Sequence, residues 1–351
     1  MTRLFRPAVN AMRGYVPGEQ PKPGSPILKL NSNENPYPPS PKAMAALRSL
    51  DSERLRRYPD PFAREFCQAV SDALDVPADW VIVGNGSDDL LNLLIRACAE
   101  DDTRQVVYPM PTYVLYRTLA EIQSSRAAEV PYADDFRLPL EALVAAAGAV
   151  TLIATPNSPS GHCVPIAELR QLAQRLPGIL AIDEAYVDFA DQTPLALVRE
   201  FDNVIVLRTL SKGYSLAGLR LGFAIANPSL LSGLFKVKDS YNVDAVAIAV
   251  GAAAIRDQAY KNHCVAQIRT ARTQLATTLE QLGFTVWPSQ TNFLLVRPAG
   301  AKAETLYQQL KSQNILVRYF NQPGLDDKLR ITIGTGEQNH TLVQAINGLL
   351  G

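Results

Sequence analysis

Thr209-Leu-Ser-Lys-Gly-Tyr-Ser-Leu-Ala-Gly-Leu-Arg-Leu-Gly222 is the stretch of sequence that says most about the fold. It follows an apolar run, Val204–Leu207, that predicts a buried strand, and it places Lys212 among hydroxyls and glycines, eight residues before Arg220. A lysine that acts as a nucleophile needs a lowered pKa, which desolvation or a neighbouring cation supplies. Hydroxyls and one arginine can together hold a phosphate. The alternative, a solvated loop lysine, is disfavoured by this dense pattern.

Short apolar runs alternate with helical periodicity around this segment, from about residue 62 onward. Helical patterns such as Ile166–Leu176 lie between several of the runs. Strands interleaved with helices are typical of a mostly parallel sheet with helices on both faces, so the sequence predicts an α/β fold. The predicted strands are Trp80–Val83, Gln105–Tyr108, Ala127–Val130, Val150–Ala154, Ile179–Ile182, Val204–Leu207 and Leu221–Ile225.

The ends of the chain differ from this middle part. Eleven of the 25 prolines fall in residues 1–61. This density predicts an extended arm, or a segment draped over another part of the structure, without regular helix or central strand. After about residue 228 a long helical region gives way to short strands with fewer crossovers, which indicates a smaller α+β domain. We therefore expect an arm at residues 1–45, belonging to the small domain and the substrate entrance, a large domain at 46–240 and a small domain at 241–351.

Composition excludes several classes of protein. The 34 Lys and Arg residues balance 34 Asp and Glu residues, which argues against a nucleic-acid-coating protein. The start, Met1-Thr-Arg-Leu-Phe-Arg6, lacks the apolar core of a signal peptide, so a soluble, cytoplasmic protein is expected. No metal site is expected, because neither the cysteines nor the histidines show ligand spacing. These residues are Cys67, Cys98, Cys163, Cys264, His162, His263 and His340.

Three further motifs follow predicted strands. Gly84-Asn-Gly-Ser-Asp-Asp89 would turn tightly into a helix whose free N–H groups attract phosphate, but Asp89 replaces the third glycine of a dinucleotide fingerprint. Asp183 ends an apolar strand, where ligands bind in open α/β sheets. Thr155-Pro-Asn-Ser-Pro-Ser-Gly161 ends another. Taken alone, each motif is better explained by an ordinary turn or a helix cap.

Together these motifs are far more specific. The set resembles the fold-type I pyridoxal-phosphate-dependent aminotransferases, a class-II aminotransferase pattern, and is most similar to their histidinol-phosphate aminotransferase branch. The likeness covers nearly the whole chain in the family's order. It includes Leu30–Pro36, Arg57–Asp60, the glycine turn, Pro111–Tyr113, the Asn157 loop, Asp183–Tyr186, the Lys212 segment and Leu329–Gly334. The Asn157 loop departs from the family, since it reads Ser-Pro and Ser-Gly where Asn-Pro and Thr-Gly are common.

The resemblance implies roles for residues around the cofactor, pyridoxal 5'-phosphate. Lys212 would form a Schiff base with the cofactor and then move the substrate proton. Asp183 would pair with the pyridinium nitrogen and keep the ring an electron acceptor. Asn157 and Tyr186 would hydrogen-bond the phenolic oxygen. Tyr113 would stack on the ring. The implied phosphate ligands are Gly86, Ser87, Thr209, Ser211, Arg220 and, from the partner subunit of a homodimer, Tyr58.

The resemblance also implies substrate contacts. Arg330 would anchor the carboxylate of the amino donor, and Arg318 and Tyr15 would hold the phosphate of histidinol phosphate. Asn33 and Glu34, in the arm, would line the pocket entrance, although a structural turn explains them equally well.

The implied reaction is reversible transamination between L-histidinol phosphate and 2-oxoglutarate, which gives imidazole-acetol phosphate and L-glutamate in histidine biosynthesis. The alternatives are an aromatic amino-acid aminotransferase and, with the same cofactor, a decarboxylase of an amino-acid phosphate. A ligand sensor joined to a DNA-binding module is disfavoured, because the proline-rich arm leaves no room for a helix-turn-helix domain. A dehydrogenase is disfavoured by the missing third glycine.

Overall fold

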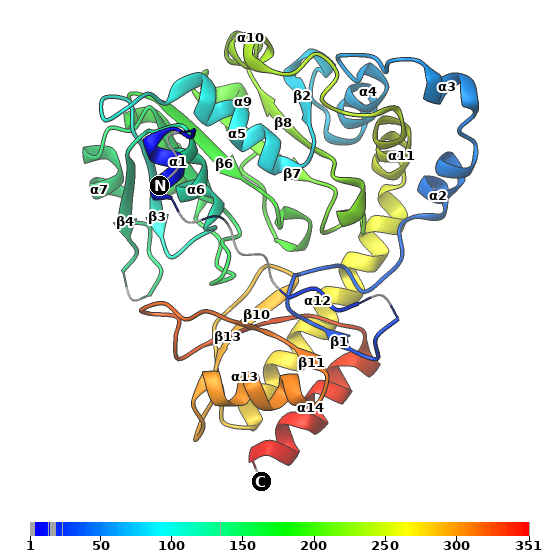
Figure 1. Ribbon diagram of the computed structural model, residues 1–351, viewed down its shortest axis with the longest axis vertical. Helices are drawn as coiled ribbons and strands as arrows, with labels where there is room; N and C mark the ends of the chain where they lie inside the picture. The colour runs from blue at the N-terminus through cyan, green and yellow to red at the C-terminus, as the bar shows by residue number, and fades with distance from the viewer. Residues whose placement is uncertain (1–3, 13, 15–18, 23, 134, 351) are drawn as a thin grey trace.

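The structure, a computed structural model, describes residues 4–12, 14, 19–22, 24–133 and 135–350. It confirms the predicted α/β fold: a large lobe is built on a mostly parallel sheet covered by helices, and a smaller lobe lies beside it (Figure 1). Within the described residues, seven strands form the large sheet in the order β2-β8-β7-β6-β5-β3-β4. They are β2 (Val81–Gly84), β3 (Val106–Met110), β4 (Ala127–Pro131), β5 (Val150–Ala154), β6 (Ile179–Asp183), β7 (Val204–Thr209) and β8 (Gly222–Ala226).

The central strands are apolar throughout because both faces of the sheet are covered. Along β6, Leu180 and Ile182 pack into the core on one face, and Ala181 packs into the core on the other. The covering helices are α4 (Arg64–Leu74), α5 (Ser87–Cys98), α6 (Leu115–Ile122), α7 (Leu140–Ala145), α8 (Ile166–Arg175), α9 (Leu197–Glu200), α10 (Pro228–Val237) and α11 (Ala245–Arg256).

Strand β8 is antiparallel to both of its neighbours, β7 and β2. The other paired strands of the sheet run parallel to one another. A parallel connection needs a long crossover, whereas residues 210–221 link β7 to β8 directly. The Lys212 segment is therefore a reversal of the chain at the carboxyl end of β7.

The small lobe has its own apolar core under an antiparallel sheet of order β12-β13-β10-β9. The long helix α12 runs into it from the large lobe (Figure 1). Its elements are α12 (Gln258–Gln281), β9 (Thr285–Val286), β10 (Phe293–Arg297), α13 (Ala303–Ser312), β11 (Ile315–Leu316), β12 (Arg318–Tyr319), β13 (Leu329–Thr332) and α14 (Gly336–Leu350).

The proline-rich residues 1–61 contain helices, so the expectation of no regular helix there was wrong. The described helices are α1 (Pro7–Ala11), α2 (Pro41–Arg48) and α3 (Ser52–Arg56). Two of them begin at a proline, since the first helical position needs no N–H donor and suits the fixed proline φ. Ser40 caps α2 by accepting hydrogen bonds from two backbone N–H groups. The prolines of this segment therefore occur at the first positions of helices as well as in extended chain.

The arm touches both lobes. Helix α1 lies beside α6 of the large lobe (Figure 1), and strand β1 (Leu28–Lys29) pairs in parallel with β11 of the small lobe. Helix α11 packs against α2 and α4, so its buried side chains belong to the large-lobe core. Since α11 packs in the large lobe and Val265 of α12 packs in the small-lobe core, the chain passes from one lobe to the other along α12, after residue 240. The domain limits remain a proposal.

Candidate functional site

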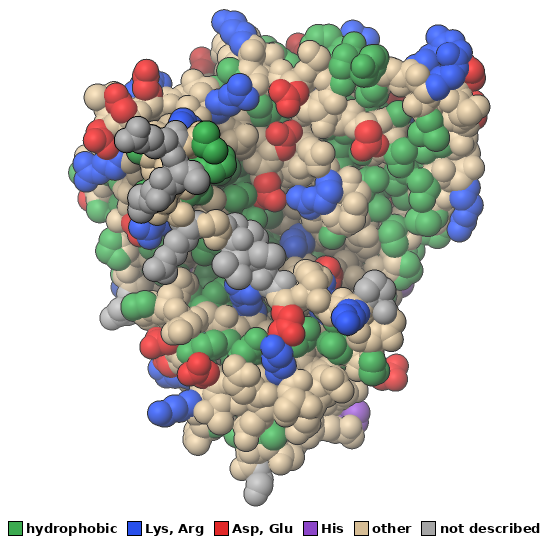
Figure 2. All heavy atoms as spheres, viewed as in Figure 1, with side chains coloured by type: hydrophobic (Ala, Val, Ile, Leu, Met, Phe, Trp, Pro, Cys, Tyr) green, Lys and Arg blue, Asp and Glu red, His purple; other side chains and the backbone are tan. Residues whose placement is uncertain are grey.

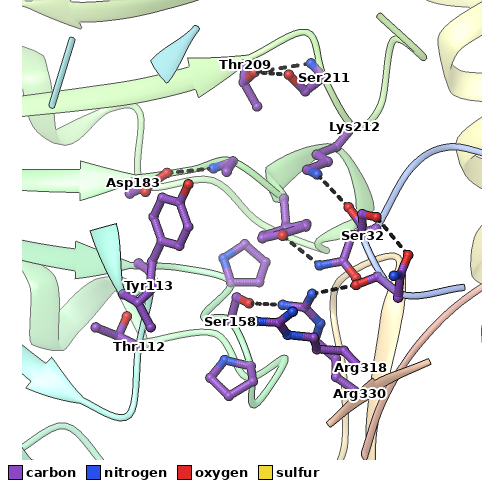
Figure 3. Close-up of a pocket in the computed structure, with 18 of the residues that line it drawn as sticks. Ser32, Thr112, Tyr113, Ser158, Asp183, Thr209, Ser211, Lys212, Arg318 and Arg330 are labelled. Carbon is purple, nitrogen blue, oxygen red and sulfur yellow. Dashed lines mark hydrogen bonds between the residues drawn. The ribbon is translucent and has the colours of Figure 1, made fainter. Parts of the chain in front are cut away.

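A cavity of about 440 Å³ lies where the carboxyl ends of the large-sheet strands meet the small lobe. This is the edge of an open α/β sheet at which ligands bind. The arm contributes residues 31–34, the large lobe contributes loops after its strands, and the small lobe contributes residues 318–322 and Arg330. Figure 2 shows basic side chains recessed in a hollow between the lobes, and Figure 3 shows side chains of all three parts facing one another.

Lys212 projects into this cavity from the reversal between β7 and β8. Its Nζ donates a hydrogen bond to the Ser32 carbonyl oxygen, 3.2 Å away, as drawn in Figure 3. The Asn35 amide donates to the Lys212 carbonyl oxygen at 3.0 Å, so the arm holds the lysine loop. The next residue has to be glycine, because the Asp188 carboxylate fills the space that a Cβ at Gly213 would take. Lys212 is thus a buttressed residue, not a solvated loop lysine.

Asp183 is the last residue of β6, and its carboxylate is buried in the cavity wall. The Tyr116 hydroxyl donates to it at 2.7 Å and the Ala185 backbone N–H at 3.1 Å. Burial raises the pKa of Asp183 to about 6, and these two hydrogen bonds limit the rise. A buried carboxylate in a ligand cavity suits a cationic ring nitrogen as its partner.

The N-terminus of α5 forms an anion cradle at one end of the cavity. Gly86 caps the helix with φ of 82°, a conformation that favours glycine, and a Cβ there would lie 2.7 Å from the Arg220 guanidinium. The Ser211 hydroxyl accepts from Arg220 at 3.4 Å, and Thr209 donates to Ser211 at 2.9 Å. Helix N–H groups from Ser87, two hydroxyls and a guanidinium are the donor set that a phosphate requires.

Asn157 lies behind the cavity wall, between the lining residues Pro156 and Ser158. Its amide nitrogen donates to the Pro111 carbonyl oxygen at 3.1 Å and to the Ser160 hydroxyl at 2.8 Å. Both amide hydrogens are therefore used within the protein in this structure, and a ligand oxygen would have to share one of them. Its contact with a cofactor remains a proposal.

Tyr186 and Asn33 meet at the boundary of the two lobes. The Tyr186 hydroxyl, in the cavity wall, accepts a hydrogen bond from the Asn33 side chain at 2.8 Å. Asn33 has a φ of 56° and is tied to the small lobe, because its backbone N–H donates to the Thr332 hydroxyl at 3.0 Å. Glu34, the next arm residue, also lines the cavity and pairs with Lys29 at 2.7 Å.

Arg318 and Arg330 are directly opposite on the antiparallel strands β12 and β13, and both line the cavity. Arg330 donates to the Ser158 hydroxyl at 2.9 Å, across the lobes, and to the Asn31 carbonyl oxygen at 3.1 Å. Both guanidinium groups lie over the Phe320 ring, 5.4 and 5.5 Å from its centroid. Two adjacent cations give this end of the cavity an affinity for anionic groups.

The other three of the four predicted tyrosines lie in different places. Tyr113 lines the cavity, donates to the Asp88 carboxylate at 3.2 Å and packs edge-on against Tyr116. Tyr58 lies on the surface outside the cavity, 81% exposed, and stacks on Tyr241 with ring centroids 4.5 Å apart. Tyr15 lies outside the described residues.

Sequence reasoning missed several residues of the site. Ser32 and Ser158 hold the cationic side chains, Tyr116 holds Asp183, and Asp88 pairs with Arg220 at 3.2 Å. Asp88, Ser32 and Ser158 stood in motifs already noted, and Tyr116 lies three residues after another of them. Nothing within those motifs singled out the two serines, because their partners come from distant parts of the chain.

Among the residues that the structure describes, no cluster of three or more His, Cys, Asp or Glu side chains is placed to hold a metal ion. Nor is any helix of these residues long and apolar enough to cross a membrane.

Comparison with known proteins supports the resemblance seen in the motifs. The model of the aminotransferase class I and II family matches residues 25–346. Histidinol-phosphate aminotransferase 1 of Nostoc sp. is 63% identical over 350 residues, covering 100% of this chain and 99% of the relative. Histidinol-phosphate aminotransferase of Citrifermentans bemidjiense is 43% identical over 345 residues, covering 98% of each.

A solved structure has the same fold over its full length. It is histidinol-phosphate aminotransferase of Sinorhizobium meliloti in complex with pyridoxal-5'-phosphate, with a TM-score of 0.89, 26% identity and 99% coverage of both chains. Family model, relatives and fold agree, and the resemblance predicted from the motifs is confirmed. The chain belongs to the aminotransferase class I and II family.

Proposed function

We propose that this protein transfers the amino group of L-histidinol phosphate to 2-oxoglutarate, giving imidazole-acetol phosphate and L-glutamate in histidine biosynthesis. The names of relatives at 63% and 43% identity over nearly the full chain support this reaction. The observation that carries it is the single cavity that joins Lys212, the buried Asp183 carboxylate and the paired Arg318 and Arg330. An amine, a ring-nitrogen partner and two anion anchors are the groups that this transamination requires.

Pyridoxal 5'-phosphate is the cofactor, and the residues present fit it. When bound, its protonated ring withdraws the electrons left behind as the substrate α-carbon loses its proton. The Asp183 carboxylate keeps the ring nitrogen protonated. The cradle at the start of α5, with Thr209, Ser211 and Arg220, holds the phosphate. The Arg220 guanidinium lies so close to Gly86 that a Cβ there would meet it at 2.7 Å, which places the cation directly beside the helix N-terminus.

Lys212 performs the proton transfer. Its Nζ contacts the neutral Ser32 carbonyl oxygen in the cavity, where it can attach the cofactor and, once released, carry a proton from the substrate α-carbon. The Asn35 side chain hydrogen-bonds the Lys212 carbonyl oxygen and fixes the loop backbone, so the Lys212 side chain can move while its backbone stays in place. Tyr113 and Tyr186 lie in the cavity wall, one to pack on the ring and the other to meet its phenolic oxygen.

Arg318 and Arg330 receive the anionic ends of the two amino compounds. Histidinol phosphate brings a phosphate, and glutamate brings two carboxylates. A planar guanidinium suits both groups, since it makes paired hydrogen bonds to either. One pair of arginines thereby serves both halves of the exchange.

We propose that the protein is a homodimer and works in the cytoplasm. Tyr58 carries a hydroxyl that would serve the phosphate, yet it is 81% exposed and lies outside the cavity of its own chain. Its stack on Tyr241 forms an exposed aromatic patch with Phe62, which is 50% exposed. A second copy covering this patch would bury the aromatic area and bring Tyr58 to the neighbouring cradle.

Substrate profiling by half-reaction tests the proposed function. Purified protein loaded with pyridoxal phosphate is mixed with histidinol phosphate or phenylalanine, and the cofactor spectrum is followed. We expect a higher kcat/KM with histidinol phosphate, and loss of the absorption band of the lysine-bound cofactor in Lys212→Ala. A large advantage for phenylalanine would identify an aromatic amino-acid aminotransferase, and carbon dioxide release without an oxo acid would identify a decarboxylase.

A further inference from the structure

A line of hydrogen-bonded side chains leads away from the cavity wall and ends at His162. The Thr112 hydroxyl donates to Asn157 Oδ1 at 2.7 Å, and Asn157 Nδ2 donates to Ser160 Oγ at 2.8 Å. Ser160 Oγ lies 2.7 Å from His162 Nδ1. Thr112, Asn157 and Ser160 are all buried, at 4%, 0% and 1% exposure, so water does not replace these bonds. Thr112 lies at the cavity side of the line (Figure 3).

The direction of each hydrogen bond follows from the chemistry. Asn157 Nδ2 also donates to the Pro111 carbonyl oxygen, which can only accept, so the amide orientation is fixed. Ser160 Oγ thus accepts from Asn157, and its own hydrogen can point to His162 Nδ1. In that arrangement Nδ1 is unprotonated and the ring proton is on Nε2, which is buried and has no hydrogen-bond partner among the described residues. All bonds then run the same way, which strengthens each of them.

The surroundings of His162 keep its ring neutral. The ring stacks on Phe136, with centroids 5.3 Å apart and planes at 24°, and meets the Tyr132 ring edge-on at 5.0 Å. Burial lowers the pKa of His162 to about 4. The ring is consequently neutral near pH 7, with one nitrogen that can accept a hydrogen bond.

We propose that His162 is a positioning residue, which acts through Ser160 to fix the Asn157 amide in the wall of the cofactor site. The inference rests on the proposed function, since it gives Asn157 a part in holding the cofactor. Without an acceptor at His162, the hydrogen of a buried hydroxyl would be unpaired. Ser160 would then turn, and Asn157 would lose one of the two acceptors that hold its amide plane.

The spectrum of the holoenzyme tests this relay. A donor on the phenolic oxygen favours the unprotonated form of the bound chromophore, so a loosened Asn157 should raise the pKa of the visible band. In His162→Leu we expect a rise of about 0.5 to 1 pKa unit and a cofactor Kd about 3- to 10-fold higher, as for one lost hydrogen bond. His162→Asn, whose side-chain oxygen can replace Nδ1, should restore values close to the natural protein.

A double substitution separates a relay from general damage to the core. Ser160→Ala should reproduce the shift of His162→Leu, and the double variant should add nothing to either one, because both break the same line. Additive shifts, or an Asn variant as impaired as the Leu variant, would overturn the inference. Circular dichroism checks folding, and if the Leu variant does not fold, Ser160→Ala alone decides by whether the band shifts.

Nuclear magnetic resonance provides a readout that does not depend on cofactor chemistry. The chain has only three histidines, so histidine-selective 15N and 13C labelling gives few signals. We expect the signal that disappears in His162→Asn to show the Nε2–H form and no titration between pH 5.5 and 8. An Nδ1–H form, or titration near the ordinary pKa of about 6.5, would refute the proposed bond direction.

The two proposals fail in different ways. If the natural protein develops no visible band with pyridoxal phosphate, the proposed function is wrong. If that band is normal and transamination proceeds, but it is unmoved in both His162→Leu and Ser160→Ala, only the role of His162 is wrong.

Discussion

Asp183→Asn should stabilise the cofactor-free protein and destabilise the loaded one. Burial raises the pKa of Asp183 from its ordinary value of 3.8 to about 6. The difference of about two pKa units corresponds to about 3 kcal/mol, at 1.36 kcal/mol per unit, that the fold loses when the carboxylate is ionised. Asparagine has nearly the same shape without the charge. Rearrangement at the Tyr116 hydroxyl takes back part of the gain, so we expect about 1–3 kcal/mol.

The pH dependence gives the sign of the effect. Below pH 3.8 the carboxyl is protonated in both the folded and the unfolded chain, and it costs nothing. Between pH 3.8 and about 6 the folded chain binds more protons than the unfolded one, so the free energy of unfolding falls as pH rises. Above about pH 6 the full cost is present. The advantage of Asp183→Asn should therefore be largest at pH 7.5 and fall to about 1 kcal/mol or less at pH 4.5.

Urea unfolding at equal protein concentration measures this advantage at both pH values, with and without pyridoxal phosphate. Saturating cofactor should reverse the order at pH 7.5, because the carboxylate then faces a protonated ring nitrogen and the amide does not. Two results would refute the reasoning: a cofactor-free variant that is no more stable at pH 7.5 than the natural protein, or an advantage that is unchanged at pH 4.5.

Three further changes have predictable results. Arg208→Met should lower the free energy of unfolding by about 3–5 kcal/mol, because it leaves the fully buried Glu184 carboxylate without the guanidinium that lies 2.6 Å away. Urea unfolding measures this loss, and a loss under about 1 kcal/mol would contradict the prediction. Gly86→Ala should weaken pyridoxal phosphate binding about tenfold or more, because the new side chain strains a positive φ and displaces Arg220. Fluorescence titration measures the Kd, and an unchanged Kd would show that the methyl group is accommodated and that the prediction is wrong. Arg330→Lys should raise KM for glutamate more than it lowers kcat, because lysine cannot form paired hydrogen bonds to a carboxylate. Steady-state kinetics measure both constants, and a fall in kcat as large as the rise in KM would contradict the prediction.

The large sheet and the lysine segment were predictable because their signals are local. Val204–Leu207 is apolar and buried, and the segment Thr209–Gly222 combines a lysine, hydroxyls and glycines within 14 residues. Asp183 was predictable only together with the other motifs, since a carboxylate that ends a strand is explained on its own by a turn or a helix cap. For the lysine segment, one short stretch of sequence contains both the chain reversal and the chemical groups.

Contacts between lobes were beyond any local pattern. Arg330 meets Ser158, 172 residues away, only because the small lobe lies over the loop after β5. Arg318 and Arg330 are neighbours through strand register, which the sequence alone leaves open. The antiparallel direction of β8 likewise depends on how residues 210–221 reverse the chain, and the spacing of apolar residues does not predict this reversal.

The arm explains why the site needs all three parts of the chain. The Ser32 carbonyl oxygen accepts from Lys212, the Asn31 carbonyl oxygen accepts from Arg330, and Asn33 donates to Tyr186. These three consecutive residues contact Lys212, Arg330 and the cavity wall. Asn33 is also bonded to Thr332 of the small-lobe sheet, so the same short segment joins the lysine loop to the small lobe. The proline-rich start of the chain, which by composition predicted only an extended arm, therefore connects Lys212 with Arg330, the residue that we propose as the substrate anchor.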